Sequence, residues 1–227
     1  MKLCYHLLKV DFYLFKWYKL NSQIINLIIM EEVKTEEINV LMLHGCNQNE
    51  QMFRDLMKTF MEIGNASAKK KNIVLNWHFI QAKYPHSLGN FTWYHKELDV
   101  AQIGSIPMDH DLVDETLDNL DEIINKLNIN VLFGFSQGAN VASTFIDYRN
   151  NNSNVKKAVL CSGYSLVDPD RKPSEILVMN VISDSDVVVK PEFMSTYPNM
   201  KIMKHEKGHK LPTSKPFVRE IIDFMLE

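Results

Sequence analysis

The segment Gly134-Phe135-Ser136-Gln137-Gly138 constrains the fold more than any other part of the chain, because it lies between a predicted strand and a predicted helix. Residues 130–135 form a short apolar run typical of a buried strand, and residues 137–148 carry apolar side chains at helical spacing. In a Gly-x-Ser-x-Gly turn between a strand and a helix, the serine is strained and the glycines give the chain room to reverse. The pattern predicts a nucleophile elbow with an exposed Ser136 hydroxyl.

Two later segments contain the groups that a serine nucleophile needs. A buried strand predicted at 176–182 leads into Asp184 and Asp186, and a short strand predicted at 200–203 leads into a loop with His205 and His209. A serine hydroxyl is a poor nucleophile until a histidine removes its proton, and an aspartate must orient that histidine. We therefore predict that Ser136 is the nucleophile, His209 the general base and acid, and Asp186 the orienting acid. The chain order Ser, Asp, His is the one this elbow requires.

Each partner of Ser136 has a local rival. Asp184 and Asp186 leave the same strand, and in an extended chain their side chains point in opposite directions, so we expect only one to reach the histidine. His205 precedes His209 by four residues. We favour His209 because the neighbouring Gly208 permits a tight loop.

Acyl transfer also needs backbone N–H groups that stabilise an oxyanion. One is expected from Gln137, directly after the nucleophile. The other is expected from the loop at 44–49, which follows a strand predicted at 38–43, and Cys46 is our candidate for this amide.

With these motifs in place, the chain resembles the FSH family of serine hydrolases, within the α/β-hydrolase superfamily. The resemblance spans residues 37–225 and several motifs recur in order. They are Val40 to Asn49, Phe91 to Tyr94, Gly134 to Ala139, Leu160 to Tyr164, Val181 to Asp186 and Gly208 to Pro212.

The resemblance implies an esterase that acts on small carboxylic esters and needs no cofactor. It places the family's nucleophile at Ser136, its acid at Asp186 and its histidine at His209. The chain departs from the family at Ser183, where such proteins usually have a glycine three residues before the acid. This departure leaves Asp184 open as the alternative acid.

The alternation of predicted elements indicates an α/β fold, with a mostly parallel sheet covered by helices on both faces. The active site is then expected at the carboxyl ends of the strands. Strands are predicted at 38–43, 74–80, 130–135, 156–161, 176–182 and 200–203, and helices at 49–63, 111–127, 137–149, 190–196 and 213–226.

The stretch 81–110 has no clear period and is rich in aromatic residues. We predict that Phe91, Trp93 and Tyr94 line the substrate pocket. The alternative is a solvent-facing loop that these rings anchor in the core.

Composition supports a single globular domain, and the small-molecule ester substrate is what the family resemblance implies. A chain of 227 residues with 45% apolar side chains can bury a sizeable core, and a net charge of -3 gives no basic footprint for nucleic acid. The cysteines Cys4, Cys46 and Cys161 are scattered and odd in number, which favours a reducing, cytoplasmic compartment. Neither they nor the histidines have metal-ligand spacing, so we expect no metal. The oligomeric state is left open.

Residues 1–35 are interpreted as an N-terminal extension to a hydrolase domain at 36–227. Charged residues interrupt every apolar run in this extension, so we expect no membrane-spanning helix and no signal peptide. We predict that the extension is dispensable, since Met30 would be a natural start. An amphipathic helix that touches a membrane is the alternative.

Two other functions stay open at this point. An acyl-protein thioesterase or lysophospholipase resembles this chain in its Gly-Phe-Ser-Gln-Gly elbow and its late Gly-His. A catalytically silent hydrolase fold that only binds a ligand or partner is the other, and labelling with a fluorophosphonate would separate it from an enzyme.

Overall fold

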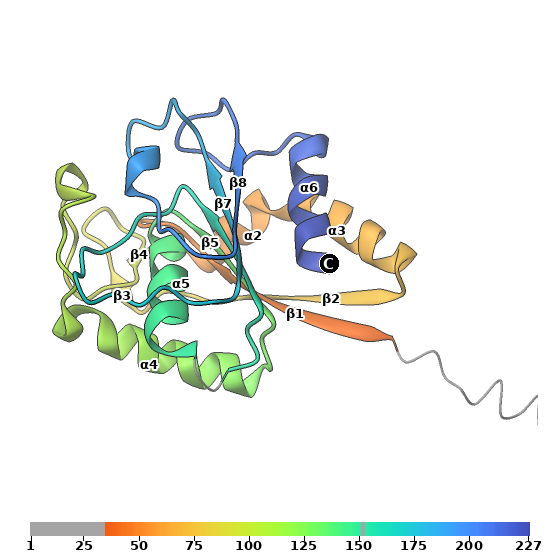
Figure 1. Ribbon diagram of the computed structural model, residues 1–227, viewed down its shortest axis with the longest axis horizontal. Helices are drawn as coiled ribbons and strands as arrows, with labels where there is room; N and C mark the ends of the chain where they lie inside the picture. Colours follow the sequence, from red (N-terminus) through yellow and green to blue (C-terminus); the bar gives the residue numbers. More distant parts are fainter. Residues whose placement is uncertain (1–34, 151–152) are drawn as a thin grey trace, which may run out of the picture. The chain divides into compact units, whose positions relative to one another are not determined.

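The computed structural model describes residues 35–150 and 153–227, and its centre is a six-stranded sheet (Figure 1). The strand order is β2-β1-β5-β6-β7-β8, and the pairings of β1 with β5, β5 with β6, β6 with β7 and β7 with β8 are parallel. The strands are β1 (Glu36–Leu43), β2 (Ile73–Phe79), β5 (Val131–Phe135), β6 (Lys157–Cys161), β7 (Leu177–Ile182) and β8 (Met200–Lys204).

Helices cover both faces of this sheet, which confirms the predicted α/β fold class. Figure 1 shows α4 and α5 on one face and α3 and α6 on the other. The helices are α2 (Glu50–Leu56), α3 (Lys58–Lys70), α4 (His110–Lys126), α5 (Gln137–Tyr148) and α6 (Lys215–Leu226). A small antiparallel pair, β3 (Tyr84–Pro85) and β4 (Phe91–Thr92), and two 3₁₀ turns, η1 (Val100–Gln102) and η3 (Pro191–Phe193), lie in the connections.

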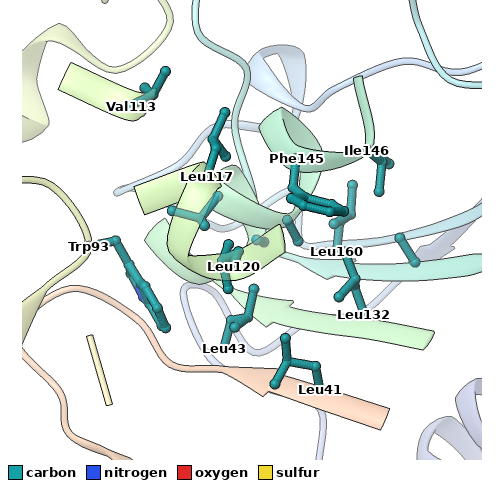
Figure 2. Packing of buried hydrophobic residues seen from close by; sticks show 14 of the residues in the cluster. Leu41, Leu43, Trp93, Val113, Leu117, Leu120, Leu132, Phe145, Ile146 and Leu160 are labelled. Carbon is teal, nitrogen blue, oxygen red and sulfur yellow. The ribbon is translucent and has the colours of Figure 1, made fainter. Parts of the chain in front are cut away.

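Strand periodicity divides the core into two apolar clusters, one on each face. In β1, Leu41 and Leu43 belong to the cluster under α4 and α5, whereas Val40 and Met42 belong to the cluster under α3 and α6. Alternate side chains of a strand point to opposite faces, so a strand buried on both sides is continuously apolar. Figure 2 shows part of the first cluster, with Trp93 among its members.

The helix predicted at 49–63 is two helices that meet at Met57. Asn49 caps α2 by accepting a hydrogen bond from the Met52 amide at 2.8 Å. The second helix, α3, runs past Gly64 to Lys70, beyond the predicted end. At Gly64 a Cβ atom would lie 2.8 Å from Trp77 and 2.9 Å from Ile222, so this glycine permits close packing inside the helix and does not end it.

The helix predicted at 190–196 is only the 3₁₀ turn η3. The Met194 amide bonds to the Pro191 carbonyl at 3.2 Å, and the backbone then becomes extended at Met194. The helical pattern is too short here to continue past one turn.

No helix in residues 35–150 and 153–227 is both long and apolar enough to cross a membrane. The extension predicted at 1–35 and Cys4 fall, apart from residue 35, outside the described residues.

Candidate active site

The nucleophile elbow joins β5 to α5 with Ser136 at its apex. Ser136 has φ 53° and ψ −119°, a left-handed conformation that L-residues seldom adopt and that is found at strained functional turns. A Cβ atom at Gly138 would overlap the Leu43 carbonyl oxygen and lie 2.5 Å from that of His44, and one at Gly134 would lie 2.5 Å from the Ala139 backbone. Glycine is required at both positions because the backbone segments approach closely.

Two consecutive hydrogen bonds connect Ser136, His209 and Asp186. His209 Nε2 lies 3.0 Å from Ser136 Oγ, and His209 Nδ1 lies 2.8 Å from Asp186 Oδ2. The carboxylate can only accept, so Nδ1 carries the proton that is donated to Asp186 and Nε2 is left to accept from the Ser136 hydroxyl. The three residues come from the ends of β5, β7 and β8, at the carboxyl edge of the sheet where the site was expected.

The Asp186 side chain is held in place by backbone donors as well. It is only 4% exposed, and its Oδ1 accepts hydrogen bonds from the amides of Val188 at 2.9 Å and Val189 at 2.8 Å. One oxygen is therefore engaged by its own loop and the other is available to His209.

The structure does not bring the rival residues into this arrangement. Asp184 is exposed and forms an ion pair with Lys204 at 3.0 Å. His205 is buried with its Nδ1 accepting from the Lys207 amide at 3.1 Å, and its ring lies against Phe217. Burial lowers the pKa of His205, so its ring is kept neutral.

Ser183, the position that departs from the family pattern, connects the loop that contains Asp186 to the loop that contains His209. Its Oγ accepts a hydrogen bond from the Gly208 amide at 3.1 Å and lies 3.0 Å from Ser185 Oγ. Gly208 has φ +63°, in the left-handed region that favours glycine. A glycine at 183 would offer no such acceptor, and no local sequence pattern predicted this contact.

The two amides predicted as oxyanion donors face no protein acceptor. In the part of the chain that the structure describes, no hydrogen bond engages the backbone N–H of Cys46 or of Gln137. The Gln137 amide is free because it begins α5, where the first N–H groups have no partner within the helix. Both groups are therefore available to a developing oxyanion.

The loop that carries Cys46 is shaped by the residues on either side of it. The Gly45 amide donates to Gln48 Oε1 at 2.8 Å, and Asn47 takes the left-handed conformation with φ 54°. The Asn47 amide also donates to the Phe91 carbonyl at 2.9 Å, which attaches the loop to β4.

The Gln137 side chain connects β4 to the elbow. Its Oε1 accepts from Thr92 Oγ1 at 2.9 Å and from the Trp93 amide at 3.1 Å, and the side chain is buried. Sequence reasoning assigned a role only to the backbone of Gln137. A glutamine directly after the serine can anchor the elbow through its side chain. The residues that bond to this side chain, Thr92 and Trp93, are distant in sequence.

A buried histidine lies beneath the loop that carries Cys46. His44 Nε2 accepts from the Ala82 amide at 3.1 Å, so Nδ1 carries the proton and donates to the Gly45 carbonyl at 2.8 Å. Burial lowers the pKa of His44 and keeps the ring neutral. Its contacts are structural, and they tie the end of β1 to the segment after β2.

Trp93 and Tyr94, which were predicted to line the substrate pocket, are buried and are not among the residues that line the cavity beside His209. Trp93 is 2% exposed and Tyr94 is 0% exposed. Trp93 Nε1 donates to the His44 carbonyl at 2.7 Å, and the Tyr94 hydroxyl donates to Asn140 Oδ1 at 2.6 Å. Each ring buries its apolar body and pairs its polar group, so both side chains anchor the segment in the core. Phe91 is half-buried, and its backbone pairs with Gln48.

A cavity of about 350 Å³ opens instead beside His209, on the α3 and α6 face of the sheet. It lies between the loop that carries Cys46 and the loop that carries His209. It is lined by Gln48, Leu56, Phe135, Lys207, His209, Lys210, Leu211 and Thr213. Phe135 directly precedes Ser136 and Gln48 lies two residues after Cys46, but Leu56 had no sequence signal that pointed to this site.

The described residues contain no group of three or more His, Cys, Asp or Glu side chains that could hold a metal ion. Cys46 and Cys161 are both free thiols.

The fold and the elbow geometry define the class of serine hydrolases with an α/β-hydrolase fold. The family model for serine hydrolase (FSH1) matches residues 33–221, and the chain belongs to this family. No curated protein matches the sequence significantly.

Solved structures of similar fold include several esterases. SOBER1 of Arabidopsis thaliana superimposes with a TM-score of 0.66 at 16% identity, covering 84% of this chain and 100% of that one. The carboxylesterase of Bacillus cereus gives a TM-score of 0.61 at 15% identity, covering 85% and 89%. A carboxylesterase from Mesorhizobium loti gives 0.59 at 14% identity, covering 83% and 88%. At these identities the likeness concerns the fold.

Proposed function

We propose that this protein hydrolyses small carboxylic esters through an acyl-enzyme, with Ser136, His209 and Asp186 as its catalytic triad. The observation that carries the proposal is the pair of hydrogen bonds from Ser136 to His209 and from His209 to Asp186. Serine hydrolase activity in general follows from the family, and the carboxylesterases of similar fold support the choice of an ester. The two free thiols fit the cytoplasm as its place of action.

The acylation step follows from this geometry. Ser136 Oγ attacks the ester carbonyl carbon while His209 Nε2 takes the hydroxyl proton, and Asp186 stabilises the imidazolium that forms. The carbonyl π electrons move to the oxygen, which accepts hydrogen bonds from the amides of Cys46 and Gln137. The intermediate then collapses, the bond to the alcohol oxygen breaks, and His209 returns its proton to that oxygen.

Deacylation repeats the sequence with water. His209 Nε2 removes a proton from a water molecule, whose oxygen attacks the acyl carbon. The tetrahedral intermediate again places its charge on the two amides. The bond to Ser136 Oγ breaks, His209 protonates that oxygen, and the carboxylic acid leaves.

Covalent labelling and ester hydrolysis test the proposal together. The full-length protein is expected to react with a fluorophosphonate probe and to hydrolyse nitrophenyl acetate, and Ser136→Ala is expected to abolish both while keeping the melting temperature. A protein that neither labels nor hydrolyses any ester would be a silent binding fold. Retention of more than about a tenth of the activity in Ser136→Ala would reject the triad.

A further inference from the structure

A second cavity adjoins the one beside His209 and lies deeper, between the α2–α3 junction and α6. Its volume is about 290 Å³. It shares three lining residues with the outer cavity, which are Leu56, Leu211 and Thr213. Its full lining is Leu56, Met57, Thr59, Phe60, Phe133, Leu211, Pro212, Thr213, Val218 and Ile221.

The two cavities differ in chemistry. The inner one has no charged side chain, and every side chain that lines it is apolar apart from two threonines. The outer one includes His209, Gln48 and two lysines. Charged side chains therefore line only the cavity beside His209, and the inner cavity presents mostly apolar side chains, as the apolar tail of an ester would require.

Leu56 marks the border between the two cavities. It is the last residue of α2, it lines both cavities, and 45% of its surface is exposed. A single exposed leucine needs no explanation. Leu56, however, forms a shared wall of the two cavities. Its side chain therefore offers apolar surface to a substrate group that extends from one cavity into the other.

We infer that the two cavities form one binding site for an ester that carries a long apolar chain, with the chain between α3 and α6. The inference rests on the proposed function, since the outer end of this site is His209. It places the apolar chain of the ester on the face of the sheet opposite Trp93, which belongs to the cluster under α4 and α5 (Figure 2). Figure 1 shows α3 and α6 together on the other side.

Chain length should then control the rate of hydrolysis. Burying one methylene is worth about fourfold in equilibrium terms, so kcat/KM is expected to rise by up to about this factor per methylene from acetate towards octanoate. Two substrate series show whether the acyl group or the alcohol of the ester carries the long apolar chain. Nitrophenyl esters of lengthening acids test the acyl side, and acetates of lengthening alcohols test the alcohol side. A rise in either series supports the site, and a flat profile in both overturns it.

The variant Leu56→Trp tests the route between the cavities. A bulky ring at the shared wall is expected to lower kcat/KM for the octanoate ester at least tenfold more than it lowers kcat/KM for the acetate ester. Met52→Trp is the matched control, because Met52 lies on the same helix, is 47% exposed and lines neither cavity. Equal losses on both esters in Leu56→Trp, or the same chain-length effect in Met52→Trp, would reject the site.

A binding measurement separates this inference from the catalytic proposal. Decanoate is expected to bind the Ser136→Ala protein in calorimetry and to bind the Ser136→Ala, Leu56→Trp double variant at least tenfold more weakly. This result would support the apolar site even if no ester were hydrolysed. Equal affinity in the two proteins, or no decanoate binding to either, would overturn the inference while leaving acetate hydrolysis and fluorophosphonate labelling as separate tests of the function.

Discussion

Ser183 Oγ accepts a hydrogen bond from the Gly208 amide at 3.1 Å, and Gly208 directly precedes His209. The loop that positions the proposed general base is thus held by a side chain from the loop of the proposed acid. We expect Ser183→Ala to lower kcat roughly tenfold, since small misplacements of catalytic groups are costly, and stability by about 1 kcal/mol. Ser185→Ala is the control, because Ser185 Oγ contacts Ser183 and not Gly208. Equal kcat values in both variants would contradict a positioning role.

Asp186→Asn is expected to reduce kcat by about 10⁴, because an amide can no longer hold the required tautomer of His209. Asp184→Asn is the matched variant, and since Asp184 is exposed and pairs with exposed Lys204, its kcat is expected to change less than about twofold. Steady-state kinetics with nitrophenyl acetate measures both. The reverse ranking would make Asp184 the triad acid.

Trp93→Ala is expected to destabilise the protein by about 3–5 kcal/mol, because it removes a large buried ring and leaves the His44 carbonyl without its partner. The ratio of octanoate to acetate hydrolysis should stay at the wild-type value, in contrast to Leu56→Trp. Urea unfolding and the chain-length profile check these two points. A changed ratio in a stable Trp93→Ala protein would restore the aromatic segment to the pocket.

Stability is expected to fall as the pH is lowered from about 7 to about 5. Burial lowers the pKa values of His44, His78 and His205, so in this window the unfolded chain binds protons that the folded protein does not. Stability therefore rises with pH until the histidines of the unfolded chain are also neutral, above about 6.5. Urea unfolding at several pH values measures the slope. His205→Gln, which cannot be protonated, should make it shallower, and a slope of opposite sign would contradict the argument.

A chain that begins at Met30 is expected to fold and to keep its hydrolase activity, because every motif of the proposed site lies after residue 37. Its melting temperature and its rate with nitrophenyl acetate should match those of the full-length protein. A loss of more than about 2 kcal/mol in stability would show that the extension packs on the domain.

The parts of the site that could be predicted are those that local pattern encodes. The strand, the glycines and Ser136 are contiguous, so the elbow could be recognised from five residues, and the ends of two later strands offered few candidates for acid and base. Strand alternation predicted that only one of Asp184 and Asp186 would reach the histidine, and the family resemblance placed the acid at Asp186. The hydrogen-bond geometry supports this placement.

The parts that could not be predicted depend on packing between distant segments. A glycine such as Gly64 ends a helix in one context and permits close contact in another, and the ring of Trp77 decides between them. Trp93 is an aromatic residue of the type that lines substrate pockets, but its indole N–H donates a hydrogen bond to the His44 carbonyl. Leu56 faces a cavity only because α2 ends opposite the loop with Leu211, a relationship that no local pattern records.

Gly138 approaches the carbonyls of Leu43 and His44 so closely that the main chain of the elbow lies against the main chain at the end of β1. This main-chain contact sets the spacing between the turn with Gln137 and the loop with Cys46. Substitutions that reshape the walls around Leu56 or Leu211 therefore leave this spacing untouched. Substrate preference and catalytic power can therefore diverge independently in such a protein, whereas a replacement at Gly138 would move the two proposed oxyanion donors relative to each other.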